Sequence, residues 1–245
     1  MDIEARGLCK RFGAREAVTN VSFRANLGTV TGFLGHNGAG KSTTMRLLTG
    51  CLAADRGNAC IGGIDIDQDP IGARANLGYL PEAANGFTNL TILEFLTFAA
   101  EAHGLWGAKK KAALTRVVDM IGLQPALGQS LGQLSKGWRQ RAWLGQALIH
   151  DPPVLILDEP TDGLDPLQKT HLRALLAQLS AEKTILMSTH ILEEAEELCD
   201  HLIILAAGRV VADVRKAELL DSAGRLAPAF IRLTQAATAT NLAAE

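Results

Sequence analysis

The sequence lacks the long apolar runs and the leader segment that mark membrane and secreted proteins. Its most apolar candidate, residues 202–207, falls well short of the ~20 consecutive apolar residues that span a bilayer and suits a buried strand. The N-terminus, Met1-Asp2-Ile3-Glu4, is acidic and has neither the basic nor the apolar region of a signal peptide. We therefore expect a chain that is soluble on its own and is not exported.

Cysteines are also few, and neither positive nor negative charge is in large excess. The four cysteines, Cys9, Cys51, Cys60 and Cys199, form no CxxC pair and have no zinc-binding spacing, so we predict reduced thiols in the cytoplasm. The 24 basic residues nearly balance the 26 acidic ones, which leaves a net charge of −2. Because this balance gives no overall attraction to polyanions, we expect no nucleic-acid partner.

The composition that remains is globular, with alternating strand and helix patterns. Of the 245 residues, 47% are hydrophobic and 20% are charged, so a sizeable core is expected and disorder of the bulk is not. Short apolar segments predict buried strands, and a helix that ends before Gly50 follows the first of them. The predicted strands are residues 29–35, 58–66, 154–158, 184–187 and 202–205, and the predicted helix is residues 41–49. This alternation predicts an α/β fold.

The middle and the end of the chain have other patterns. From about residue 84 to 151 the pattern is helical and begins with a capping box, Thr91-Ile-Leu-Glu94, which predicts an inserted helical subdomain. Within it, the lysines at 109–111 are interpreted as a solvated helix face. The end of the chain is rich in Ala and Thr with little periodicity. We therefore predict a main domain over residues 1–220 and a short, poorly ordered tail over residues 221–245.

The strongest motif is GHNGAGKS at residues 35–42, which matches the phosphate-binding pattern GxxxxGK[ST] between a predicted strand and a predicted helix. Glycines let successive backbone N–H groups converge on phosphate oxygens, and the helix directs its positive end at the same anion. Lys41 is expected to reach the β- and γ-phosphates, and Ser42 Oγ to ligate magnesium. The predicted nucleotide-binding residues here are Gly35, Asn37, Gly38, Ala39, Gly40, Lys41, Ser42 and Thr43.

Polar residues follow two of the predicted strands, at the sheet edge where ligands of open α/β sheets bind. Asp158 suits a water-mediated magnesium contact, and Glu159 suits polarisation of a water for attack on the γ-phosphate. Without the phosphate loop, a helix cap or a solvated loop would be the preferred interpretation of this acidic pair. His190 follows the strand at 184–187 and can bond the γ-phosphate or orient the water. We interpret the other histidines as structural: His36, His103, His150, His171 and His201.

Residues 134–141, LSKGWRQR, complete a set of motifs that resembles the ATP-binding subunit of an ABC transporter. The resemblance covers about residues 3–220. It rests on the order of a phosphate loop, YLPE at the Q-loop position (79–82), the signature helix, the acidic strand, DGLD as the D-loop (162–165) and His190 as the switch histidine. It implies a P-loop NTPase core, with a mostly parallel sheet, an antiparallel β portion and an inserted helical subdomain.

The resemblance also implies roles outside the loop. Phe12 would stack on the adenine of ATP, since an aromatic face offers stacking to a base. Ser135 and Gly137 would contact the γ-phosphate held by the other protomer, and Asp165 would join the two sites of a head-to-tail dimer. ATP and Mg²⁺ are the implied cofactors. The implied partners are a second copy of the chain and separate transmembrane permease subunits, which would hold it on the cytoplasmic face of the membrane.

Some positions depart from the usual pattern of the family. In the LSGGQ signature, Lys136 and Trp138 replace the first glycine and the glutamine, and Lys136 would either add positive charge near the phosphate or face solvent. Glu82 stands where the Q-loop normally carries glutamine; its carboxylate cannot donate hydrogen bonds but can still ligate Mg²⁺, beside Ser42 and Asp158. GHNGAGK, YLPE and LSKGWRQR look like the exporter branch for drug or sodium efflux, gliding motility and nitrous-oxide reductase maturation.

These motifs predict an ATP-hydrolysing subunit that powers a membrane ABC transporter, of the exporter type, through ATP-driven closure of a head-to-tail dimer. The alternative is a soluble ABC ATPase of DNA repair, translation or iron-sulfur assembly. Repair relatives insert long coiled coils and translation factors fuse two cassettes, and this sequence has neither pattern. A small-molecule phosphotransferase would keep the phosphate loop but would leave LSKGWRQR unexplained.

Overall fold

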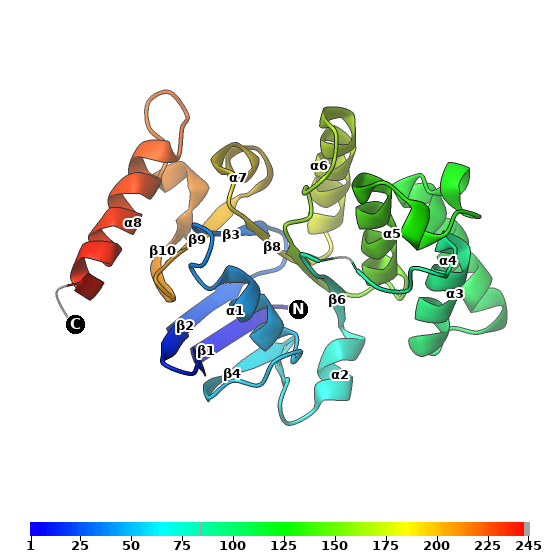
Figure 1. The fold of residues 1–245 in the computed structure, drawn as a ribbon, viewed down its shortest axis with the longest axis horizontal. Helices are drawn as coiled ribbons and strands as arrows, with labels where there is room; N and C mark the ends of the chain where they lie inside the picture. The colour runs from blue at the N-terminus through cyan, green and yellow to red at the C-terminus, as the bar shows by residue number, and fades with distance from the viewer. Residues whose placement is uncertain (84, 243–245) are drawn as a thin grey trace.

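A mostly parallel sheet forms the centre of the larger lobe (Figure 1). The computed structural model describes residues 1–83 and 85–242. The strand order is β10-β9-β3-β8-β7-β6, and β10 is the antiparallel strand at one edge. The strands are β3 (Val30–Leu34), β6 (Leu77–Leu80), β7 (Val154–Asp158), β8 (Thr184–Thr189), β9 (His201–Ala206) and β10 (Arg209–Arg215). The apolar strands predicted near residues 29–35, 154–158, 184–187 and 202–205 are confirmed.

An antiparallel sheet packs against this one, with the strand order β2-β1-β4-β5. Its strands are β1 (Ile3–Phe12), β2 (Arg15–Ala25), β4 (Arg56–Ile61) and β5 (Ile64–Asp65). Helix α1 (Lys41–Leu48) contacts both sheets, because Met45 shares a buried core with Ile3 of β1 and Ile156 of β7. The phosphate loop therefore leads into a helix that is fixed from both sides. The fold is the predicted combination of a parallel core with an antiparallel portion.

Helices on the other face of the parallel sheet complete the larger lobe. Side chains alternate along β7, so Leu155 and Leu157 face α6 (Pro166–Ser180) and α7 (Leu192–Leu198), whereas Ile156 faces α1. Burial on both faces explains why β7 is apolar along its whole length before Asp158. The short helix α2 (Pro70–Ala75) precedes β6.

The segment between β6 and β7 is helical and projects away from the sheets (Figure 1). It contains α3 (Ile92–Ala102), α4 (Gly107–Ile121) and α5 (Lys136–Leu148). The predicted capping box begins α3: Glu94 N donates to Thr91 Oγ1 at 3.2 Å, and Thr91 N donates to Glu94 Oε2 at 2.8 Å. Phe95 and Leu96 share a core with Leu80 of β6, which anchors these helices to the sheet.

The prediction of a poorly ordered tail is wrong for most of residues 221–242, because they contain α8 (Ala227–Leu242). Leu226, Ala229 and Phe230 are buried, and α8 contacts β9 and β10. Positions 226, 229 and 230 have helical spacing, so tertiary packing stabilises a segment whose Ala- and Thr-rich composition suggested little order. Residues 243–245 lie outside the described part of the chain.

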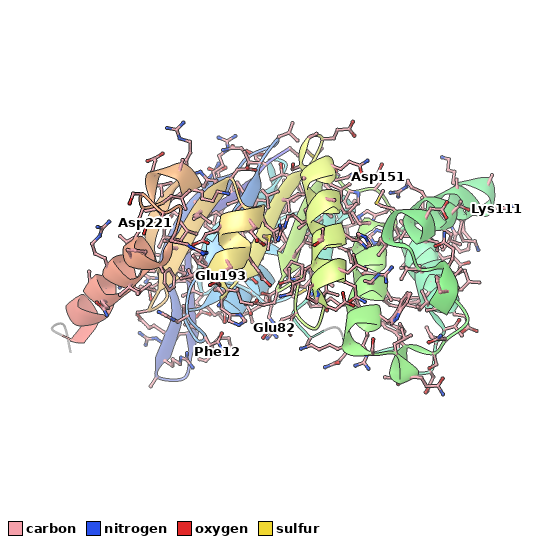
Figure 2. The ribbon with its side chains drawn as sticks, turned by 90° about the horizontal axis from the view of Figure 1, so that it is seen from above. Phe12, Glu82, Lys111, Asp151, Glu193 and Asp221 are labelled. Atoms are coloured by element: carbon pink, nitrogen blue, oxygen red, sulfur yellow. The ribbon has the colours of Figure 1, made fainter. Side chains whose placement is uncertain are left out.

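Two of the predicted site residues, Phe12 and Glu82, lie on the same side of the molecule (Figure 2). In Figure 2, Phe12 and Glu82 are on the side opposite Asp151, which precedes β7, while Lys111 and Asp221 mark the two ends. The carboxyl ends of β6, β7 and β8 share this side, because these strands are parallel neighbours. No helix in the described ranges is both long and apolar enough to cross a membrane.

Candidate active site

The phosphate loop connects β3 to α1 through positions that accept only glycine. Gly40, with φ of 106°, precedes the helix, and a Cβ atom there would lie 2.5 Å from the Ala17 carbonyl oxygen. At Gly35 a Cβ atom would lie 2.5 Å from the Leu205 carbonyl oxygen. Gly40 has no side chain to cap the helix, so the first N–H groups of α1 are left for an anion. The loop is thus built as an anion cradle.

Lys41 lies within this cradle as a buried cation. Its Nζ donates to the carbonyl oxygen of Gly35 at 2.7 Å and lies 3.9 Å from Glu159 Oε1. Burial lowers the pKa of the Lys41 ammonium, and the neighbouring carboxylates, with Glu159 first, oppose that shift. A desolvated cation held beneath an anion cradle is suited to pair with a phosphate.

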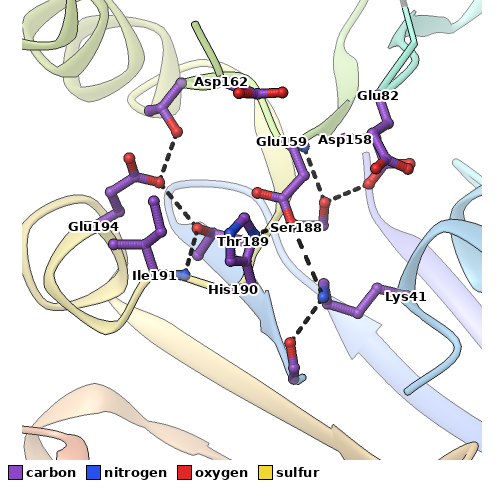
Figure 3. A network of polar contacts seen from close by, with 12 residues as sticks. Lys41, Glu82, Asp158, Glu159, Asp162, Ser188, Thr189, His190, Ile191 and Glu194 are labelled. Carbon is purple, nitrogen blue, oxygen red and sulfur yellow. Dashed lines mark hydrogen bonds and ion pairs between the residues drawn. The ribbon is translucent and has the colours of Figure 1, made fainter. Parts of the chain in front are cut away.

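Oxygen-bearing side chains converge beside Lys41 (Figure 3). Ser42 Oγ lies 3.0 Å from Glu82 Oε2 and 3.4 Å from Asp158 Oδ1, and its single hydrogen can serve only one of them at a time. Ser188 Oγ donates to Asp158 as well. Burial raises the pKa of Asp158, so an added cation would be favourable there. Two carboxylates and a hydroxyl fit Mg²⁺, which binds one or two protein carboxylates together with substrate phosphates.

Glu159 is held in an uncommon backbone conformation at the end of β7. Its φ is 50°, in the left-handed region that favours glycine. Its N–H donates to Ser188 Oγ at 3.0 Å, and Gln140 Nε2 donates to its carbonyl oxygen at 3.2 Å, which fixes the residue from both sides. His190 Nδ1 lies 2.9 Å from Glu159 Oε1. Burial raises the pKa of Glu159, and the His190 contact opposes that rise.

A cleft of about 440 Å³ joins these groups to the end of the first β-hairpin. Phe12, which is 52% exposed, lines this cleft together with Lys41 and Glu159. The remaining lining residues are Arg15, Ala17, Asn37, Gly38, Gly40, Ser42, Thr43 and Glu82. Two other predicted residues do not line the cleft: the carbonyl oxygen of Gly35 accepts a hydrogen bond from Lys41, and Ala39 is buried. The cleft therefore combines an exposed aromatic face with cationic and carboxylate groups.

Ser135, Gly137 and Asp165 are not brought to this cleft; they form a second group at the ends of α5 and α6. Ser135 caps α5 by accepting from Trp138 N at 3.4 Å, and Asp165 caps α6 by accepting from Gln168 N at 2.8 Å. Gly137 is packed against α6, since a Cβ atom there would lie 2.7 Å from Gln168 Oε1. These predicted residues are thus close to one another and apart from the phosphate loop.

Three side chains that support the site were not predicted from the sequence: Arg15, Gln140 and Ser188. Arg15 donates to the Gly38 carbonyl oxygen at 3.2 Å, but it belongs to a hairpin whose pattern was not recognised. Ser188 pairs in register with Asp158 on the neighbouring strand, and its place just before His190 was an available signal. Gln140 lies within LSKGWRQR and is buried, so its long amide reaches Glu159 across the lobes.

Comparisons with known proteins agree with this geometry. A family model described as ABC transporter matches residues 18–162. The chain is 37% identical over 222 residues to the Nod factor export ATP-binding protein I of Cupriavidus metallidurans, a match that covers 90% of this chain and 73% of the relative. An ATP-binding subunit of an ABC transporter superposes with a TM-score of 0.87 at 32% identity, covering 96% of this chain and all of the other. A dimeric bacterial ABC transporter cassette superposes at 0.79 with 25% identity, covering 87% and 98%.

Proposed function

Because this chain belongs to the ABC transporter family and is one of its ATP-binding ATPase subunits, we propose that it powers a membrane exporter through ATP-driven closure of a head-to-tail dimer. The observation that carries the proposal is the cleft that joins Phe12 to Lys41, Ser42 and Glu159. An exposed aromatic face and an anion cradle in one cleft match the base and the triphosphate of ATP. The name of the relative in C. metallidurans supports the direction of transport.

ATP is bound by residues from two sheets in this proposal. Phe12, at the end of β1, stacks on adenine, which exposed aromatic faces do without reading the identity of the base. The backbone N–H groups of residues 35–43 cradle the phosphates, and Lys41 pairs with the β- and γ-phosphates. Ser42, Asp158 and Glu82 are the residues that would hold Mg²⁺, which neutralises charge on the phosphates when bound.

Hydrolysis follows from the position of Glu159. Its buried carboxylate has a raised pKa and lies beside Lys41, so it can accept a proton from a water that attacks the γ-phosphate. The fixed backbone of Glu159 and the 2.9 Å contact with His190 Nδ1 orient the carboxylate. His190 is 45% exposed at its side chain, so it can also face the γ-phosphate. Phosphoryl transfer depends mainly on such positioning and charge stabilisation.

A second copy of the chain would complete each site. Ser135, Gly137 and Asp165 lie outside the chain's own cleft, and a dimeric cassette has the same fold. In a head-to-tail dimer, the N-terminus of α5 would face the γ-phosphate bound by the partner, where Ser135 Oγ and backbone N–H groups would stabilise its charge. Asp165 would lie between the two sites. Each chain would thus supply the nucleotide-binding cleft of one composite site and the signature residues of the other.

A permease would bind beside Glu82 and the projecting helices. An apolar groove there is lined by Tyr79, Pro81, Phe87, Phe95, Phe98, Ala99, Ala102, His103, Trp143 and Gln146. Phe87 and Phe98 are 45% and 51% exposed, and the groove begins at the strand that leads to Glu82. Exposed aromatic residues in a groove are typical of a protein-binding site. A helix of the permease on the cytoplasmic face of the membrane fits this groove and would sense the Glu82 loop.

Two measurements test the proposal on the full chain. First, ATP should be converted to ADP and free phosphate in a magnesium-dependent reaction; a phosphorylated small-molecule acceptor would instead indicate a phosphotransferase. Second, the chain should co-purify from detergent extracts with a multispan membrane protein, and the double change Phe87→Ser and Phe98→Ser should abolish that association. Association with ribosomes or soluble scaffolds, unaffected by those changes, would reject the transport role.

A further inference from the structure

Lys136 occupies the first position of α5, at the positive end of the helix dipole. A cation at this position is unfavourable for the helix. The described first turn of α5, residues 136–139, contains no acidic side chain to offset it. Arg139, the other cation of the turn, donates to the carbonyl oxygens of Leu131 and Leu134 at 3.3 and 3.2 Å. Lys136 therefore depends on an anion from another segment.

Asp162, in the loop between β7 and α6, supplies that anion. Lys136 Nζ lies 2.5 Å from Asp162 Oδ2, and the stem of the lysine rests on Gly163. The two side chains are 62% and 44% exposed, so the ion pair is open to solvent. Exposed pairs of this kind shift an equilibrium by about fivefold at most. A more highly charged anion could therefore displace Asp162.

The ion pair lies where the proposed composite site needs a phosphate contact. Ser135 and Gly137 flank Lys136, and a Cβ atom on Gly137 would lie 3.0 Å from the Gly163 carbonyl oxygen, so the start of α5 and the Asp162 loop are in contact. A terminal phosphate carries more charge than a carboxylate and presents several acceptor oxygens to an ammonium group. It would also offset the dipole of α5.

We propose that Lys136 is a phosphate-binding residue that exchanges partners. Asp162 holds its ammonium group in the separate chain, and the γ-phosphate of ATP bound by the second copy replaces Asp162 in the closed dimer. The inference rests on the proposed head-to-tail dimer and assigns a regulatory residue within it. Asp162 then opposes closure of the dimer, because the ion pair within the chain must break first. The strength of this ion pair helps to set the ATP concentration at which the two copies associate.

Opposite effects of the two partners distinguish this exchange from a structural ion pair. Loss of a structural pair has the same consequence whichever side chain is changed. In an exchange, Asp162→Asn frees Lys136 for phosphate and favours association, whereas Lys136→Met removes the phosphate contact and disfavours it. The double variant should behave like Lys136→Met, because without the lysine the aspartate has nothing to restrain.

The experiment measures dimer formation by analytical ultracentrifugation of the full chain against ATP concentration, with Glu159→Gln present to block turnover. We expect Asp162→Asn to lower the half-maximal ATP concentration by up to about fivefold. We expect Lys136→Met to raise it by about tenfold or more, the effect of losing a hydrogen bond to a charged group. Lys136→Arg should stay within a few-fold of Glu159→Gln alone, because the positive charge is retained.

A matched control is the exposed pair of Lys110 with Glu101, whose Nζ and Oε1 atoms are also 2.5 Å apart. Lys110→Met and Glu101→Gln should leave the half-maximal ATP concentration unchanged. If Glu159→Gln alone forms no dimer with ATP, the proposed dimer fails, and the role of Lys136 fails with it. If that chain does dimerise but Asp162→Asn and Lys136→Met shift the curve in the same direction, or not at all, only the exchange is rejected.

Discussion

Replacement of Glu159 by glutamine separates the binding of ATP from its hydrolysis. The side chain keeps its size, and the bonds of its backbone to Ser188 and Gln140, at 3.0 and 3.2 Å, do not involve the carboxylate. The amide can still contact His190 Nδ1, so the cleft should keep its shape and its affinity for ATP. What is lost is a basic oxygen. Removal of a general base lowers turnover by roughly 10²- to 10⁴-fold, or about 3 to 5 kcal/mol of activation free energy.

The assay pairs phosphate release at saturating ATP with equilibrium binding of a fluorescent ATP analogue. Glu159→Gln should bind the analogue within a few-fold of the unchanged protein while phosphate release falls by the stated factor. Glu193→Gln is the matched control, because Glu193 is an exposed carboxylate on α7, and its turnover should be normal. Phosphate release by Glu159→Gln within tenfold of the unchanged protein would refute the role of Glu159 as general base.

Further predictions concern the rest of the cleft and the C-terminal helix. Glu82→Gln should keep basal phosphate release within several-fold, since its amide oxygen can still ligate a cation; a collapse would place Glu82 in the hydrolytic machinery. Phe12→Ala should raise the KM for ATP by roughly fivefold to a hundredfold through lost stacking, and Phe12→Trp should not. His190→Ala should move the acid limb of the kcat/KM profile to higher pH, because the His190 contact lowers the pKa of Glu159 and a general base works only when deprotonated; a shift to lower pH would contradict this. Phe230→Ala should lower stability by about 3 to 5 kcal/mol and the Tm in calorimetry by roughly 10 °C, because a buried phenyl ring is lost; an unchanged Tm would show that α8 is not held there.

The convergence of the catalytic groups was predictable because parallel strands end at a common edge. Asp158 is the last residue of β7, His190 follows the neighbouring β8, and the phosphate loop follows β3 on the other side of β8. Three separate sequence segments therefore had to meet once the sheet was parallel. The sequence did not predict the left-handed backbone of Glu159 or its buried bond from Gln140, because both depend on how the helical segment packs against the sheet.

The first β-hairpin was less predictable because its alternation is irregular. The pairing of β1 with β2 shifts register between Ala5 and Leu8, and again before Lys10 and before Arg11. Each shift moves the following side chains to the other face, so the period-2 pattern breaks within one strand. Phe12 could be assigned only through the family resemblance, and Arg15 was missed. For α8, by contrast, apolar residues at helical spacing were present in the sequence. The surrounding alanine and threonine residues made that pattern too weak to predict a packed helix.

The two groups of predicted residues differ in what they need from a partner. The cleft of one chain is lined by Phe12, Lys41 and Glu159, and the signature residues lie outside it. The start of α5 has a cation, Lys136, that the exposed carboxylate of Asp162 offsets. In the proposed function, the cleft of one chain therefore carries the phosphates of ATP, and the start of α5 in the other chain offers a site suited to a phosphate. Under this proposal, a single chain would bind ATP alone but would gain the signature contacts to the γ-phosphate by joining a second copy. The free energy of binding would then drive association of the two chains, and a permease bound beside Glu82, as proposed, would follow that movement.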